Sequence, residues 1–161
     1  METESPDTQV DGDFVMGSRA VMALSGGMDS TSLLLRLLRD GHDVTCVSYE
    51  YGQKHSIEIE RAKENIQRLQ SMGMEVSHKI IDLSSAMGTF HSALTNHNYK
   101  VPEGHYEEIQ MKQTVVPNRN AIFSSILYGM ALSISQSEDK EVIVALGVHS
   151  GDHAIYPDCR P

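Results

Sequence analysis

The chain has 161 residues, 40% of them hydrophobic, and a formal net charge of −9 at pH 7, which bounds it to one domain, or one domain with an appendage. The acidic balance argues against a non-specific grip on nucleic acid, which needs clustered lysine and arginine, and the sequence holds neither a membrane-length apolar run nor a signal-peptide core. Two cysteines, Cys46 and Cys159, provide no disulfide framework, so we expect a cytoplasmic protein with no membrane or nucleic-acid partner.

The first predicted elements are a leader, a strand and a helix. Residues 1–17 are polar and acidic without periodicity, which predicts a flexible leader ahead of a folded unit at 18–161. The apolar run at 20–24 predicts a short buried strand. A helix follows, because leucines recur at helical spacing between residues 33 and 38 and Gly41 is placed to end it.

The sequence Ser-Gly-Gly-Met-Asp-Ser at residues 25–30 joins that strand to that helix. Two glycines allow close backbone approach, and the free N–H groups and dipole of the helix's first turn favour an anion. Ser25 and Ser30 add hydroxyl donors, while Asp29 either caps the helix or helps to hold Mg²⁺ beside phosphates. No Gly-Lys-Ser/Thr follows, so this is not a Walker A loop. A plain turn is the alternative, but the context favours a phosphate site.

Further along the chain, strands and helices alternate. Residues 44–49 and 75–81 predict a second and a third strand, separated by a helix that Gly73 follows. The apolar face of that helix is expected to comprise Ile57, Ala62, Ile66 and Leu69. This order predicts an α/β, Rossmann-like fold with a parallel sheet and helices on both faces. Because ligands bind beyond the carboxyl ends of such strands, the turn at 25–30 lies at the expected edge.

The alternation breaks at 83–113, which contains three histidines and few large apolar residues. A long insertion of this kind is either disorder or a lid over the site. A helix is expected from Pro117, a good first-turn residue, with an apolar stripe comprising Ile122, Phe123, Ile126, Leu127, Met130 and Ile134. Residues 142–146 predict another buried strand, and the polar segment 147–161 follows its carboxyl end.

Four motifs, in this order, carry a family resemblance: SGGMDS at 25–30, YGQKH at 51–55, VPNRN at 116–120 and YPDCR at 156–160. The first resembles the PP-loop of the ATP pyrophosphatases, which cleave ATP between its α and β phosphates. Together the four resemble the 7-cyano-7-deazaguanine synthases of queuosine-precursor synthesis, over about residues 19–160. The resemblance implies an adenine nucleotide α-hydrolase-like fold. It also implies a ligase that converts 7-carboxy-7-deazaguanine and ammonia to the nitrile with ATP and Mg²⁺, through adenylate and amide intermediates.

The resemblance also implies roles for individual residues. The ATP-binding segment comprises Leu24, Ser25, Gly26, Gly27, Met28, Asp29, Ser30 and Thr31. The candidate catalytic residues are Asp29, with Mg²⁺ as its partner, and the cations Lys54 and Arg119, placed next to ATP or its adenylate. The candidate substrate-binding residues are Tyr51, Asn118, Tyr156, Asp158 and Arg160. Asp158 would accept from a guanine-like N–H edge, and Arg160 would bind a carboxylate or a phosphate in bidentate fashion.

Structural alternatives stay open for several of these residues. Lys54 and Arg119 are otherwise solvated surface cations, Asn118 and Asn120 are otherwise helix caps, and Tyr51 is otherwise a half-buried sheet residue. The loop residues His149, Asp152 and His153 have the right types for a metal, but hydrogen bonding beside a nucleotide is favoured. For His55, donation to a phosphate and a role as a structural cap are equal alternatives. Cys159 is expected to pack in the substrate loop, and Cys46 to be a buried hydrophobe.

The chain departs from the family at its end. Family members continue into helices and a four-cysteine zinc cluster, which two cysteines cannot supply, so we expect no zinc and read the chain as lacking that segment. This departure leaves open whether the chain forms a homodimer and completes the reaction. Three alternatives remain: transfer-RNA thiolation, deazaguanine-type DNA modification or phage defence, and a non-catalytic nucleotide-binding fragment.

Overall fold

The computed structural model describes residues 17–52, 57–90 and 118–148. Several predicted features lie outside these ranges: nearly all of the leader, most of the 83–113 insertion, Lys54, and the segment from residue 149 onward.

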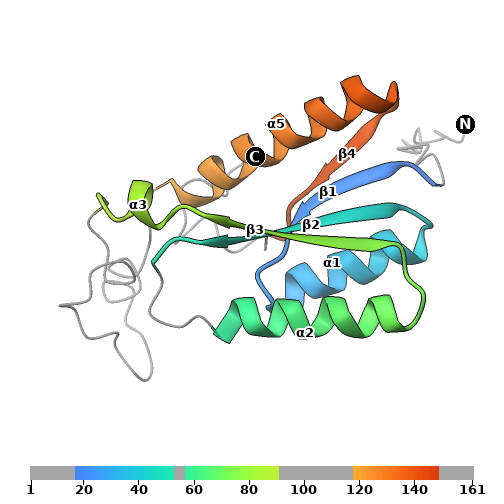
Figure 1. Ribbon diagram of the computed structural model, residues 1–161, viewed down its shortest axis with the longest axis horizontal. Coiled ribbons are helices and arrows are strands. Elements are labelled where there is room, and N and C mark those ends of the chain that lie inside the picture. The colour runs from blue at the N-terminus through green and yellow to red at the C-terminus, as the bar shows by residue number, and fades with distance from the viewer. Residues whose placement is uncertain (1–16, 53–56, 91–117, 149–161) are drawn as a thin grey trace, which may run out of the picture.

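The described residues form a four-stranded parallel sheet with the strand order β3-β2-β1-β4 (Figure 1). The strands are β1 (Arg19–Ala23), β2 (Asp43–Glu50), β3 (Val76–Asp82) and β4 (Val142–Ala145). The helices are α1 (Met28–Arg39), α2 (Ile57–Ser71), the single turn α3 (Ser84–Met87) and α5 (Arg119–Glu138). The predicted α/β, Rossmann-like class is therefore confirmed, with each predicted strand displaced by no more than a residue or two.

Helices cover both faces of the sheet, as the alternation predicted (Figure 1). Helices α1 and α2 pack on one face, where Leu34 and Ile66 meet Met22 and Cys46 of the two central strands. Helices α3 and α5 pack on the other face, on a second cluster comprising Val21, Val47, Tyr49, Tyr51, Met87, Phe123, Leu127 and Ala131. Burial on both faces explains why β2 reads as an almost uninterrupted run of buried residues.

The helix ends agree with the sequence signals at some positions and differ at others. Gly41 and Gly73 follow α1 and α2 with φ angles of +84° and +80°, which glycine adopts at little cost. Ile57 was expected on the apolar face of α2, but it is 54% exposed, and Ile59 is buried in its place. Helix α5 begins at Arg119 rather than at Pro117.

An ion-pair cluster joins three elements at the amino end of the sheet. The guanidinium of Arg19 in β1 contacts the carboxylates of Asp43 in β2 and Glu138 in α5. The hydrogen bonds that Arg19 donates to Glu138 and the nearby carboxylate charges raise the pKa of Arg19, against the effect of desolvation. Among the helices of the described ranges, none is long and apolar enough to cross a membrane.

Candidate functional site

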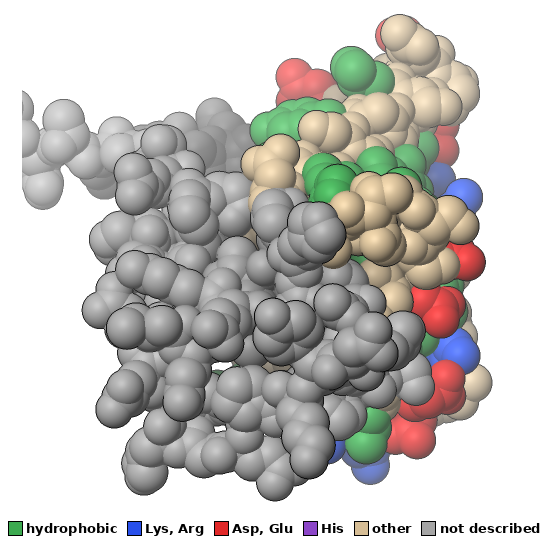
Figure 2. All heavy atoms as spheres, turned by 90° about the vertical axis from the view of Figure 1, so that its left-hand side faces the viewer, with side chains coloured by type: hydrophobic (Ala, Val, Ile, Leu, Met, Phe, Trp, Pro, Cys, Tyr) green, Lys and Arg blue, Asp and Glu red, His purple; other side chains and the backbone are tan. Residues whose placement is uncertain are grey.

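Helices α1, α2 and α5 all begin at the edge of the sheet where the strands end (Figure 1). The first-turn N–H groups of all three helices are therefore directed toward one region, which favours negative charge there. Figure 2 views this end of the molecule, and its described part has acidic and basic side chains interspersed rather than gathered in a single patch.

The turn between β1 and α1 is tied together by its own hydroxyl groups. The Ser30 hydroxyl receives a hydrogen bond from the Ser25 amide (3.2 Å), lies 3.0 Å from the Ser25 hydroxyl and donates to the Gly27 carbonyl (3.3 Å). The Gly27 amide donates to the Ser25 hydroxyl (3.2 Å), and the Thr31 hydroxyl donates to the Gly27 carbonyl (2.7 Å). Gly27 is the N-cap residue of α1, and no side-chain capping hydrogen bond is made at this end of the helix. The turn is therefore an ordered loop at the open end of a helix.

Two glycines let other segments pack closely against this turn. Gly26 has a φ angle of +80°, and a Cβ there would collide with the Glu58 carbonyl oxygen and lie 3.1 Å from the Ala62 amide nitrogen. At Gly147, just after β4, a Cβ would lie 3.1 Å from the Ser30 Cα atom. Helix α2 and the end of β4 therefore contact the turn with backbone, and a side chain at either glycine would displace them.

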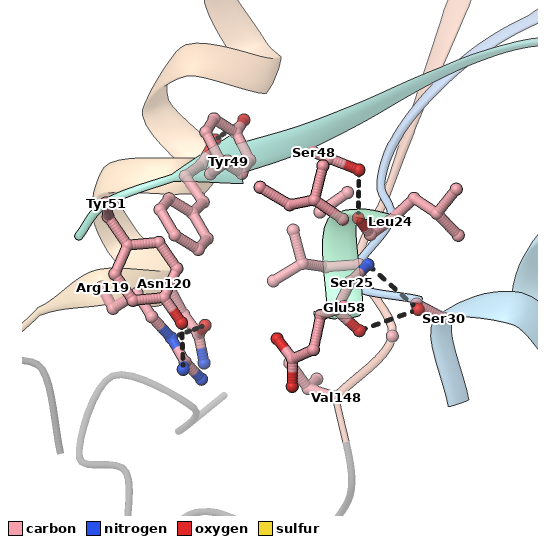
Figure 3. Close-up of a pocket in the computed structure, with 15 residues that line it drawn as sticks. Leu24, Ser25, Ser30, Ser48, Tyr49, Tyr51, Glu58, Arg119, Asn120 and Val148 are labelled. Carbon is pink, nitrogen blue, oxygen red and sulfur yellow. Dashed lines mark hydrogen bonds between the residues drawn. The ribbon is translucent and has the colours of Figure 1, made fainter. Parts of the chain in front are cut away.

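A pocket of about 310 Å³ opens beside the turn (Figure 3). It is lined by Ala23, Leu24, Ser25, Ser30, Ser48, Tyr49, Tyr51, Glu58, Ile59, Arg119, Asn120, Phe123, Leu146, Gly147 and Val148. The lining comes from three strand ends, the turn, and the first turns of α2 and α5. Hydrophobic and aromatic sides with a few polar groups are typical of small-molecule sites.

Arg119 and Glu58 bring opposite charges to this pocket. Figure 3 shows Arg119 and Asn120 on one side, next to Tyr51, and the carboxylate of Glu58 on the other. Arg119 donates through Nη1 to the Tyr51 hydroxyl (3.4 Å) and through Nε to the Asn120 amide oxygen (3.4 Å). The pocket can therefore contact a ligand that has both negative groups and hydrogen-bond donors.

Three aromatic rings form the apolar side of the pocket. Tyr49 stacks on Phe123 with 4.0 Å between ring centroids, and Tyr51 is tilted against Phe123 at 5.6 Å. The Tyr49 hydroxyl donates to the Phe123 carbonyl (3.0 Å), and burial raises the pKa of Tyr49, so this phenol stays neutral. These rings make a rigid surface against which a flat heterocycle can pack.

The structure brings together some of the predicted site residues and separates others. Leu24, Ser25, Ser30, Tyr51 and Arg119 all line the pocket. Met28 and Asp29 lie in the first turn of α1, where both are exposed and neither lines the pocket. Gly26, Gly27 and Thr31 lie in the turn or the first turn of α1 and do not line the pocket either. Outside the described ranges are the predicted site residues Lys54, Tyr156, Asp158 and Arg160, together with His55, His149, Asp152, His153 and Cys159.

The capping alternatives have different outcomes, because only Asn118 of the residues considered as caps occupies an N-cap position in the described ranges. Gly27 rather than Asp29 occupies the N-cap position of α1. Asn118 does occupy the N-cap of α5, but with a left-handed φ of +56° and no capping bond from its side chain, and it does not line the pocket. The Asn120 side chain instead receives the bond from Arg119.

Sequence reasoning missed Glu58, Ser48, Asn120 and the close approach of Gly147. Glu58 lies on the polar face of an amphipathic helix, a position that normally indicates a solvated side chain. Within the described ranges, no group of three histidine, cysteine, aspartate or glutamate side chains has the geometry of a metal site.

Comparison with known proteins identifies relatives of this chain. Residues 19–161 match the family model described as "Queuosine biosynthesis protein QueC". The 7-cyano-7-deazaguanine synthase of Hahella chejuensis is 46% identical over 144 residues, which cover 89% of this chain and 58% of the relative. The synthase of the same name from Methanoregula boonei is 45% identical over 143 residues, with 89% and 61% covered. This chain thus spans about three-fifths of the length of these relatives.

Two solved structures share the fold. The NH3-dependent NAD synthetase of Campylobacter jejuni superposes with a TM-score of 0.51 and 18% identity, covering 85% of this chain and 49% of that one. The NMN synthetase of Francisella tularensis gives a TM-score of 0.53 and 17% identity, with 83% and 46% covered. At these identities the likeness concerns the arrangement of strands and helices alone.

Proposed function

We propose, from the premise that this chain belongs to the family of the queuosine biosynthesis protein QueC, that it catalyses the ATP-dependent synthesis of 7-cyano-7-deazaguanine from 7-carboxy-7-deazaguanine and ammonia. The observation that best supports this proposal is the Ser25–Ser30 turn, which lies at the start of α1 and opens into a pocket of about 310 Å³. A helix start flanked by serine hydroxyls suits phosphates, and the aromatic pocket beside it suits a heterocycle.

The chemistry requires two activations. A carboxylate is a poor electrophile, so its oxygen attacks the α-phosphorus of ATP, pyrophosphate leaves, and a mixed anhydride with AMP forms. Ammonia attacks the anhydride carbon, AMP leaves, and a primary amide results. The amide oxygen then attacks the α-phosphorus of a second ATP and pyrophosphate leaves, after which departure of AMP and loss of both N–H protons give the nitrile. Each activation releases a highly charged leaving group, so electrostatic stabilisation is the main demand on the protein.

The described residues can be matched to these steps. In this proposal the Ser25 hydroxyl and the first-turn amides of α1 bind the phosphates, and Ser30 orients the turn through its bonds to Ser25 and Gly27. Arg119 stabilises charge on ATP or its adenylate. The exposed carboxylate of Asp29 is an oxygen ligand of the kind Mg²⁺ prefers, and it lies in the turn where the phosphates would bind. Mg²⁺ would neutralise part of the phosphate charge.

We propose that Tyr51 contacts the heterocycle, and that Tyr156, Asp158 and Arg160 complete its binding. Lys54 is proposed as a second cation for ATP. The cytoplasmic location and the homodimer stay predictions.

Isotope exchange between pyrophosphate and ATP tests the proposal. With the 161-residue chain, Mg²⁺ and 7-carboxy-7-deazaguanine, label should move from pyrophosphate into ATP, because adenylate formation is reversible. Omitting the deazaguanine, or replacing it with guanine, should abolish exchange. Adding ammonia should yield the amide, which mass spectrometry detects. Nucleotide binding without substrate-dependent exchange would instead favour a non-catalytic nucleotide-binding fragment, and exchange that requires transfer RNA would favour thiolation.

A further inference from the structure

The peptide group that joins Leu24 to Ser25 is held by side chains at both of its polar atoms (Figure 3). The Leu24 carbonyl accepts a 2.6 Å hydrogen bond from the Ser48 hydroxyl of β2. The Ser25 amide donates to the Ser30 hydroxyl of α1 at 3.2 Å. Because both atoms belong to one rigid plane, the two bonds together fix the rotation of that plane at the entrance to the turn.

A third side chain extends this arrangement to β3. The Ser48 hydroxyl also lies 2.8 Å from Nε2 of His78. A hydroxyl has one proton, and the Leu24 carbonyl can only accept, so Ser48 donates to Leu24 and accepts from His78. Burial and the nearby charge of Lys63 lower the pKa of His78, so the ring is neutral at pH 7 and has its single proton on Nε2.

The hydrogen bonds therefore run in one direction, from His78 to Ser48 to Leu24. Ser48 and Leu24 are each only 2% exposed, so water does not readily replace the donor of either bond. Although Ser48 lines the pocket, its one proton is already engaged with Leu24, which separates its role from that of a ligand-binding hydroxyl.

We propose that Ser48 and His78 are positioning residues for the phosphate-binding turn, which act by fixing the orientation of the Leu24–Ser25 peptide. The direction of that peptide sets where the Ser25 hydroxyl and the Gly27 amide point, since these two are bonded to each other in the turn. The consequence for ATP rests on the function proposed above, while the consequence for the turn itself does not.

A matched pair of substitutions isolates the Ser48 hydroxyl. Ser48→Thr and Ser48→Val have nearly the same shape and differ in one hydroxyl, so any effect of the added bulk is common to both. We expect Ser48→Thr to keep the KM for ATP·Mg²⁺ in the exchange assay near that of the parent, and Ser48→Val to raise it by about tenfold or more, since a buried carbonyl loses its donor. The KM for 7-carboxy-7-deazaguanine should change little in either variant.

A second measurement makes the test independent of catalysis. The Ser25 amide resonance of the ligand-free, ¹⁵N-labelled chain should match the parent in Ser48→Thr and shift in Ser48→Val. His78→Gln, which offers an N–H near the same position, should preserve the Ser25 amide resonance better than His78→Leu. This second pair of variants provides the test if Ser48→Val does not fold. Equal Ser25 resonances within both pairs would overturn the positioning role. A parent chain that lacks exchange altogether would overturn the proposed function and leave the resonance test to decide the inference.

Discussion

The carbonyl oxygen of Glu58 occupies the space into which a side chain at Gly26 would extend. Gly26, which gives the turn its left-handed bend, therefore also lets the first turn of α2 pack against the turn. This contact sets the position of Glu58, whose side chain faces Arg119 across the pocket (Figure 3). This contact predicts that a side chain at Gly26 lowers the stability of the protein.

Gly26→Ala should destabilise the protein more than Gly73→Ala. Both glycines have φ near +80°, so each alanine incurs a backbone cost of about 1–2 kcal/mol. Only at Gly26 does the new methyl group also meet backbone atoms, whereas Gly73 has nothing within 4 Å. Urea unfolding of both variants measures the difference. An equal decrease in the free energy of unfolding in both variants would show that α2 can move away from the turn without cost.

Asp29→Asn should reduce ATP·Mg²⁺ use while stability changes little. Because Gly27 is the N-cap, Asp29 interacts with α1 only through the helix dipole, a contribution of about 0.3–1 kcal/mol. We expect a fall in pyrophosphate exchange of about tenfold or more if the carboxylate helps to hold Mg²⁺ at the phosphates. Asp40→Asn, at the other end of the helix, controls for loss of a carboxylate far from the turn, and it additionally removes the ion pairs with Arg36 and Arg39. Normal exchange with a lowered melting temperature would limit Asp29 to a role in helix stability.

Arg119 should be more sensitive to substitution than its partner Tyr51. The bond from Arg119 to the Tyr51 hydroxyl is long, at 3.4 Å, so Tyr51→Phe should change exchange only slightly. Arg119→Ala should lower kcat/KM for ATP by about tenfold or more, and Arg119→Lys should restore part of it, since lysine keeps the charge without the planar fork. Steady-state exchange kinetics of the three variants test this order. A larger loss in Tyr51→Phe than in Arg119→Ala would reverse the assignment.

His78 should make the protein less stable as the solution is acidified. Burial lowers its pKa below the ordinary value of 6.5, so the unfolded chain binds a proton at a higher pH than the folded chain does. The free energy of unfolding should therefore fall as pH drops from about 6.5 toward the lower folded-state pKa, and this contribution should then level off. His78→Gln should lack it. Melting curves of both chains between about pH 7.5 and pH 5 provide the comparison, and parallel curves would exclude the linkage.

The sequence predicted the order of strands and helices because each element has a local signal. Apolar runs define β1, β2 and β4, and Gly41 and Gly73 end two helices in the left-handed conformation that favours glycine. Ile57 was misplaced because the buried stripe of α2 starts at Ile59, and two positions along a helix correspond to about 200° of rotation, which turns Ile57 away from the sheet.

The candidate site was predicted only where its residues form a contiguous motif. The Ser25–Ser30 turn could be read directly, since glycines, hydroxyls and a following helix occur together. Glu58 and Ser48 could not, because their place in the pocket depends on how α2 and β2 pack against that turn. A carboxylate on a polar helix face and a serine inside a strand have no local pattern that separates them from ordinary residues.

The pairing of β4 with β1 has a consequence for how the molecule is made. Arg19 pairs with Val142, and Gly147 packs on Ser30, so the turn contacts residues synthesised long after it. While a ribosome is still adding the intervening segments, one edge of β1 has no partner strand, and an unpaired apolar edge invites association with other chains. Contacts this distant in sequence also form slowly. The turn is therefore translated early but completed late, after β4 has emerged.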